Sequence, residues 1–136
     1  MSSYLTIYVR PDKDVEPIPL VHFTRSSEIY QSFYESINPV YIGLGDTCEY
    51  TELTESLVSI VLHQLQSELR IAQTRLSEYE KHVDGHMEII EEILNQHEYI
   101  DDIVYAIHQT EFILDMVKDA DYVIEGPKRT ILCNID

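Results

Sequence analysis

Residues 53–83, LTESLVSIVLHQLQSELRIAQTRLSEYEKHV, carry the pattern that decides the fold. Their apolar side chains are spaced alternately four and three positions apart, and no proline or glycine interrupts them. Such a heptad spacing predicts one long helix with a continuous apolar seam. Leu53 and Thr54 precede it as a hydrophobic staple and an N-cap. The seam consists of Val58, Leu62, Leu65, Leu69, Ala72, Leu76, Tyr79 and Val83.

A second long helix is predicted after a turn at Asp84-Gly85, because apolar residues again repeat every seven positions. Further apolar residues flank this repeat on both sides, so the helix has a wider apolar face than a two-stranded coiled coil requires. We therefore expect a helical hairpin whose second helix packs against more than one neighbour. The repeated positions are Ile93, Ile100, Ile107 and Leu114, flanked by Ile89, Ile103 and Val117 on one side and by Ile90 and Val104 on the other.

Both ends of the chain show the period-two alternation of half-buried strands, at residues 4–9 and 130–135. A second short strand is expected at residues 20–23, after a connection punctuated by prolines. Ser26 or Ser27 caps a short helix that Asn38-Pro39 ends. Residues 40–50 read as a loop with a short extended piece at residues 40–42.

These elements predict an α+β fold, with a small antiparallel sheet from both chain termini plus a short helix at the base of a long antiparallel two-helix hairpin that resembles a coiled coil. A length of 136 residues suits one domain. Its expected parts are the sheet and short helix in residues 1–50, the hairpin in residues 53–120 and the C-terminal strand in residues 128–136.

The chain has 9 basic and 25 acidic residues, for a formal net charge of −16. Such a field repels nucleic-acid phosphates and anionic lipids, so direct binding to either is disfavoured and basic protein surfaces are favoured. The charge is concentrated in residues 84–125, which contain twelve acidic residues against the single basic residue Lys118. The acidity therefore belongs mainly to the second long helix.

Projection of that helix places five carboxylates on the side opposite the Ile93 row. We call this set the acidic stripe. It admits two interpretations, a solvated face that keeps the protein dissolved, or a docking surface for a basic partner. The near absence of interspersed lysine favours the second. The acidic stripe consists of Glu88, Glu91, Glu92, Glu98 and Asp102.

Two further polar residues, His97 and Glu111, fall at the edge of the apolar face and are candidates for a polar pair in an interface between subunits. The sequence holds no Glu-x-x-His pair of the kind that binds two metal ions in a helical bundle, and no G-x-S-x-G, P-loop or G-x-G-x-x-G motif. We accordingly predict no catalytic, cofactor-binding or metal-binding residues.

Cys48 and Cys133 form no C-x-x-C pair, no basic and apolar leader opens the chain, and no apolar run is long enough to cross a membrane. These features favour a reducing, cytoplasmic location. In size and negative charge the chain is similar to the nucleic-acid mimics and nuclease inhibitors of phages and mobile elements, such as anti-restriction and anti-CRISPR proteins.

The sequence therefore predicts a non-enzymatic interaction protein that occupies a basic, nucleic-acid-binding type of surface on a partner and that forms a homo-oligomer through its wide hairpin face. Two alternatives remain open. One is a structural or assembly protein whose hairpins form the oligomer and whose charge only prevents aggregation. The other is a small-ligand binder or enzyme with a site between subunits, where His97 and Glu111 would be the first candidates.

Overall fold

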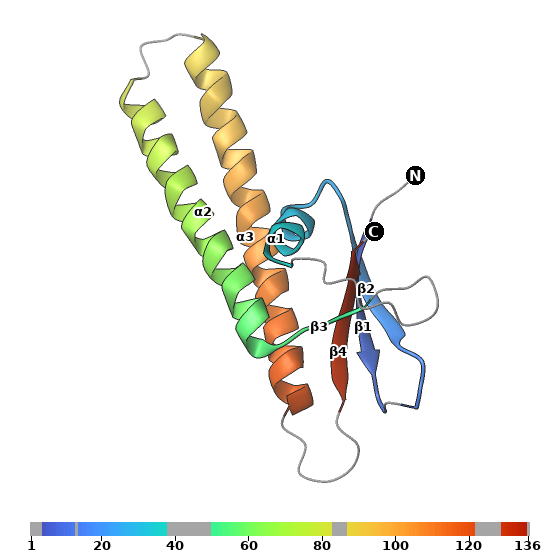
Figure 1. The fold of residues 1–136 in the computed structure, drawn as a ribbon. Helices are drawn as coiled ribbons and strands as arrows, with labels where there is room; N and C mark the ends of the chain where they lie inside the picture. The colour runs from blue at the N-terminus through green and yellow to red at the C-terminus, as the bar shows by residue number, and fades with distance from the viewer. Residues whose placement is uncertain (1–3, 13, 38–49, 83–86, 122–128, 136) are drawn as a thin grey trace.

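The structure is a computed structural model that describes residues 4–12, 14–37, 50–82, 87–121 and 129–135. It confirms the predicted α+β class. A four-stranded antiparallel sheet contains strands from both ends of the chain, and a short helix lies between this sheet and two long helices that pack against each other (Figure 1).

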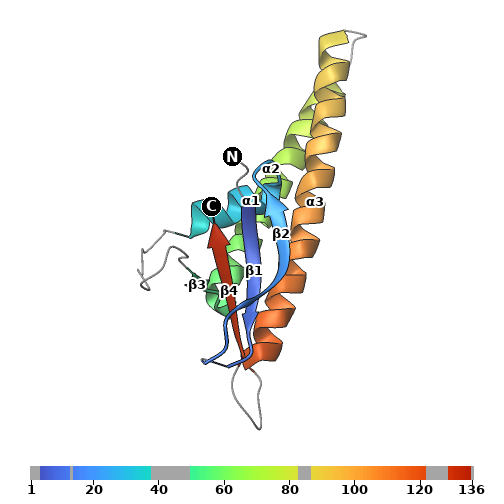
Figure 2. The same ribbon diagram turned by 90° about the vertical axis from the view of Figure 1, so that its right-hand side faces the viewer.

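The sheet has the strand order β2-β1-β4-β3 (Figure 2). The first and last strands pair antiparallel at its centre, as predicted, from Leu5 opposite Ile135 to Arg10 opposite Thr130. This central pairing ties the two ends of the chain together. The strands are β1 (Tyr4–Arg10), β2 (Ile18–Thr24), β3 (Thr51–Glu52) and β4 (Thr130–Ile135).

Two strands differ from the prediction. β2 begins at Ile18 rather than Leu20 and so includes Pro19, which the strand tolerates because it lies at the edge of the sheet and has β1 on only one side. β3 was not predicted, since two residues are too few to show an alternation. The extended piece expected at residues 40–42 lies outside the described residues.

The helices begin where their caps were predicted. Ser27 precedes α1 (Glu28–Ser36), and its side chain accepts a hydrogen bond from the backbone N–H of Tyr30. Thr54 precedes α2 (Glu55–Lys81), and its Oγ1 accepts from the N–H of Leu57 at 3.2 Å. The third helix, α3 (Met87–Asp121), follows. The predicted turn at Asp84-Gly85 and the last seam residue, Val83, lie outside the described residues.

The core joins one face of the sheet to all three helices. Leu5 and Ile7 of β1 and Ile131 and Cys133 of β4 are buried on that face. α1 contacts β1 and β2, α3 contacts β4, and α2 packs along α3 and α1. On α3 the most buried positions lie in its second half. They are Ile103, Ala106, Ile107, Thr110, Ile113, Val117 and Ala120.

Thr110 is the polar member of this buried face, and its hydroxyl donates a 2.7 Å hydrogen bond to the carbonyl of Ala106 one turn earlier. The hydroxyl is therefore satisfied inside its own helix. The prediction that α3 packs against more than one neighbour is confirmed, because the helix meets α2, α1 and β4. Ile90, which was expected on the apolar face, is instead 39% exposed, because the arm has few neighbours.

The half of the hairpin farther from the sheet is less tightly packed than the half beside it. We call residues 73–82, which are the end of α2 and its C-cap His82, and residues 87–102 of α3 the arm, and it extends past the end of the sheet (Figures 1 and 2). None of the described side chains in the arm is fully buried. The side-chain oxygen of Gln96 is enclosed there without a hydrogen-bond partner among the described residues. The arm is thus held mainly by α2 and α3, and only its end near Tyr99 and Ile100 packs against the core.

Because the base of the hairpin is more tightly packed than the arm, replacing leucine by alanine should lower the free energy of unfolding by different amounts at two seam positions of α2. Leu65→Ala removes a fully buried side chain at the base and should lower the free energy of unfolding by about 2–5 kcal/mol. Leu76→Ala removes a half-buried side chain in the arm and should cost about 1 kcal/mol. Urea denaturation measures both, and equal costs would contradict the weaker packing of the arm.

Candidate functional site

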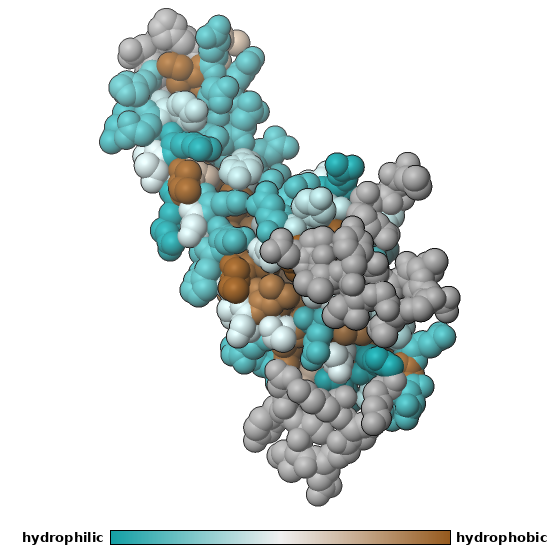
Figure 3. All heavy atoms as spheres, in the orientation of Figure 1, coloured by the Kyte–Doolittle hydropathy of each residue, from teal (hydrophilic) through white to brown (hydrophobic). Residues whose placement is uncertain are grey.

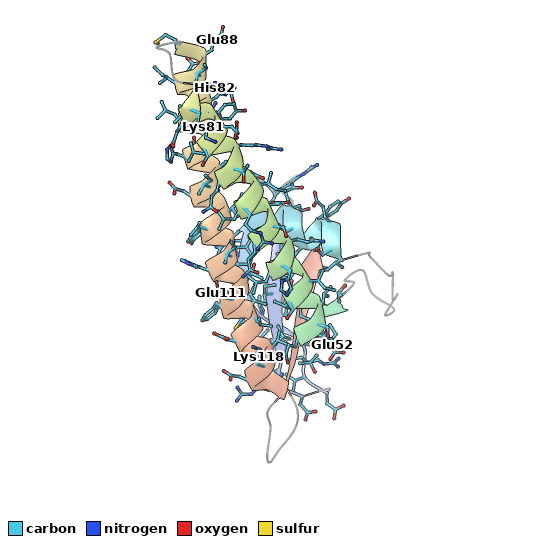
Figure 4. All side chains as sticks on the ribbon, turned by 90° about the vertical axis from the view of Figure 1, so that its left-hand side faces the viewer. Glu52, Lys81, His82, Glu88, Glu111 and Lys118 are labelled. Atoms are coloured by element: carbon cyan, nitrogen blue, oxygen red, sulfur yellow. The ribbon has the colours of Figure 1, made fainter. Side chains whose placement is uncertain are left out.

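The five carboxylates of the acidic stripe all lie on the surface of the arm. α3 holds them in a single helix of 35 residues, and every one of the five side chains is exposed. Glu88 stands at the far end of the hairpin (Figure 4). The stripe is exposed because the sheet stops short of the arm (Figure 1) and α1 approaches the stripe only at Asp102.

The ion pairs of the arm leave the acidic stripe unpaired. Within the described residues they join Lys81 to Glu78 at 3.5 Å and His97 to Glu80 at 3.9 Å, and neither includes a carboxylate of the stripe. Both pairs are exposed and contribute little to stability. The stripe therefore presents five carboxylates to solvent with no cation bound to them from the described part of the chain.

His97 and Glu111 do not form a pair within one chain. They are fourteen positions apart on α3, which is about 21 Å along the helix axis. His97 is more than half exposed and faces Glu80 of α2, whereas Glu111 lies exposed lower on α3 (Figure 4). A contact of either residue with a second subunit stays a prediction.

The structure also brings together carboxylates that the sequence analysis did not connect. We call Glu28 and Glu35 of α1, Glu68 of α2 and Asp102 of α3 the three-helix cluster. Burial raises the pKa of Glu28, and the negative charges of Glu68, Asp102 and Glu35 raise it further. Burial and the charge of Glu35 likewise raise the pKa of Glu68. The crossing of α1 over the hairpin thus places like charges near one another.

Burial and the same carboxylates also affect the neighbouring Tyr99. Burial raises its pKa, the carboxylates of Glu68, Glu28 and Glu35 raise it as well, and the guanidinium of Arg75 acts in the opposite direction. Nothing in the sequence signals the cluster, since its members come from three separate helices and the direction in which α1 crosses the hairpin has no local sequence code.

Cys133 is a free thiol in the core, and burial raises its pKa to about 12, so it stays protonated and unreactive. Cys48 lies outside the described residues. Among the described histidines, cysteines and carboxylates, no three are grouped so that they could hold a metal ion. None of the described helices combines the length and apolarity needed to cross a bilayer.

Comparison of the chain with protein-family models, with curated proteins and with solved structures finds no match in any of the three.

The three-helix cluster predicts a stabilising substitution. Glu68→Gln removes a carboxylate that is repelled in the folded state, so at neutral pH it should raise the free energy of unfolding by a few tenths of a kcal/mol, a small gain because the group is partly exposed and screened. Urea titrations of the two proteins measure this difference. Glu16→Gln, the same change at an exposed loop position, is the control and should have no effect.

The pH dependence of this gain follows from the raised pKa of Glu68. The folded protein binds the proton more tightly than the unfolded chain, so the wild-type protein gains stability as the pH falls from neutral toward 4.5, the ordinary pKa of the group. The advantage of the E68Q variant should therefore shrink over that interval. An advantage that grew as the pH fell would contradict the repulsion in the cluster.

Proposed function

We propose that this chain is a non-enzymatic interaction protein whose acidic stripe occupies a basic, nucleic-acid-binding type of surface on a partner protein. The mode of action would be that of the small acidic inhibitors of phages and mobile elements, such as anti-restriction and anti-CRISPR proteins. One observation carries the proposal, namely that five exposed carboxylates lie on one helix face and that the described ion pairs of the arm include none of them.

The physical basis is electrostatic. α3 contains ten acidic residues and one lysine, so its field attracts cations and basic surfaces over a distance set by the ionic strength. Complementary charge of this kind speeds the encounter with a basic partner and rejects acidic ones. Nucleic acids and anionic membranes are among the rejected partners. The extension of the arm past the sheet leaves the stripe open to a large partner (Figure 1).

The free thiol of Cys133 in the core supports a reducing compartment such as the cytoplasm as the place of action. Basic nucleic-acid-binding proteins are abundant there, and the proposed partner belongs to that class.

A second candidate function is assembly, in which hairpins of several copies form a homo-oligomer. The arm supports it, since no described side chain there is fully buried, and so do Ile60 and Ile71, which stand half exposed on α2. An oligomer built on apolar contacts would survive high salt, whereas a complex built on the acidic stripe would dissociate. Light scattering at several protein and salt concentrations separates the two functions.

Neutralising the acidic stripe should abolish partner binding. The variant replaces its glutamates by glutamine and Asp102 by asparagine, which changes the net charge from −16 to −11. Because the removed charges are those in contact, we expect affinity for the captured partner to fall at least about tenfold. The partner is obtained by affinity capture from lysate and salt elution, identified by mass spectrometry, and its binding is then measured with purified proteins.

The matched control removes the same five charges elsewhere. Its substitutions are Asp14→Asn, Glu16→Gln, Glu52→Gln, Asp115→Asn and Asp119→Asn, all at exposed positions. If binding depends on the acidic stripe, this control should bind nearly as well as the wild-type protein. Equal loss in both variants would mean that only the bulk charge matters, and unchanged binding in the stripe variant would overturn the proposal.

A further inference from the structure

Four large apolar side chains of α3 are more than half exposed to solvent. Met87 is 72% exposed, Leu94 62%, Tyr105 66% and Phe112 64%. Single exposed apolar residues are common on protein surfaces and need no explanation. These four have a regular arrangement, however, and that arrangement is the basis of the inference.

The four positions form one line along the helix. Their separations are 7, 11 and 7 residues, and in an α-helix each of these steps returns to within about 20° of the starting direction. The seven-residue and eleven-residue steps deviate in opposite senses, so the whole row stays within about 20° of one direction. We call Met87, Leu94, Tyr105 and Phe112 the outer apolar row, and it runs for about 38 Å.

The outer apolar row faces away from the core of this chain. Each of its two aromatic residues is followed by a buried one, Ala106 after Tyr105 and Ile113 after Phe112. Successive residues of a helix point about 100° apart, so the outer apolar row and the buried face occupy different sides of α3. The hairpin and the sheet therefore leave these side chains uncovered.

The charges beside the outer apolar row are acidic. In the gap between Leu94 and Tyr105 lie Glu98 and Asp101, on either side of its line, and Glu91 adjoins Leu94 one turn earlier. All three carboxylates are exposed, and Glu91 and Glu98 belong to the acidic stripe. The only lysine of α3, Lys118, lies beyond the end of the row. The surface thus combines a line of apolar contacts with acidic flanks.

We infer that this surface binds a basic amphipathic helix of the partner protein, with its apolar stripe against the outer apolar row and its lysines and arginines against Glu91, Glu98 and Asp101. The inference rests on the proposed function and specifies the partner's binding element. A helix fits a straight row on another helix because ridges and grooves interlock at a separation of about 8–10 Å. Burial of the aromatic pair would add affinity that salt does not screen.

Charge argues against a second copy of this chain as the occupant. Two α3 helices laid along each other would bring together ten acidic residues from each, opposed by one lysine from each. Like charges at such a distance repel, whereas a basic helix neutralises the same carboxylates.

Synthetic peptides of about 18 residues, roughly 27 Å as a helix, test the inference directly. The first is built from leucine and lysine with the leucines on one helical face. The second has the same composition with the leucines distributed around the helix, and the third is oligolysine of equal charge. Fluorescence anisotropy of the labelled peptides measures binding to the whole protein at low and at physiological ionic strength. We expect the first peptide to bind at least about tenfold more tightly than the other two.

The variant that tests the outer apolar row is Leu94→Ser, Tyr105→Ser, Phe112→Ser, and it should weaken binding of the first peptide at least about tenfold. A control removes three exposed apolar side chains elsewhere, Tyr34→Ser, Ile60→Ser, Ile71→Ser, and should leave binding nearly unchanged. Circular dichroism verifies that both variants remain folded. A charge variant, Glu91→Gln, Glu98→Gln, Asp101→Asn, should weaken the binding of all three peptides.

The outcomes separate the two proposals. If the charge variant loses the peptides while the row variant binds them as the wild-type protein does, the surface is purely electrostatic, and the inference fails while the proposed function stands. If neither variant changes binding, both fail. If the wild-type protein is a dimer in sedimentation and the row variant is a monomer, the outer apolar row is a self-association surface and the inference is overturned.

Discussion

The structure depends on the packing of α3, which is buried on two sides at once in its second half. One side meets the apolar seam of α2, and the other meets α1 and the sheet, where β1 and β4 bring the two ends of the chain together. Ile103 and Leu65 are both fully buried in the common core. Without this double contact the small sheet would have no layer to cover it, because a sheet of this size needs a helical partner.

The same packing divides α3 into two parts that differ in burial and in charge. The second half is fixed by neighbours on two sides, and its buried hydroxyl at Thr110 is satisfied within the helix. The first half has α2 beside it and meets α1 only near Tyr99 and Asp102, and it carries the acidic stripe. Glu88 and Glu92, like Glu98 and Asp102, are four positions apart, where like charges cost a few tenths of a kcal/mol per pair. Charge and weak packing thus occur together in the arm, whose surface is mostly hydrophilic in the view of Figure 3.

Much of the fold could be predicted because its signals are local and strong. The alternation at both chain ends, the caps Ser27 and Thr54 and the seam of α2 each specify an element without reference to the rest. The two-residue strand β3 has no such signal, and the edge position that lets β2 begin one residue before Pro19 becomes visible only in the assembled sheet. The three-helix cluster escaped prediction for the same reason, since Glu28, Glu68 and Asp102 meet only through the direction in which α1 crosses the hairpin.

Helical periodicity finds the strongest apolar face and assigns it to the core, and in α3 this assignment is right for Ile103, Ile107 and Val117. The outer apolar row is a second, weaker apolar line on the same helix. Periodicity does not reveal it, because its few members resemble isolated apolar residues beside the main face. Solvent exposure in the structure distinguishes the outer apolar row from the core face, since Leu94, Tyr105 and Phe112 are more than half exposed. A cation-only partner would neutralise the carboxylates of α3 and leave these side chains in water. A partner that covers both relieves the repulsion and buries the apolar surface in one step, and it stabilises the arm by binding its folded form. The coexistence of the two features on one helix is therefore better explained by a mixed contact than by charge alone.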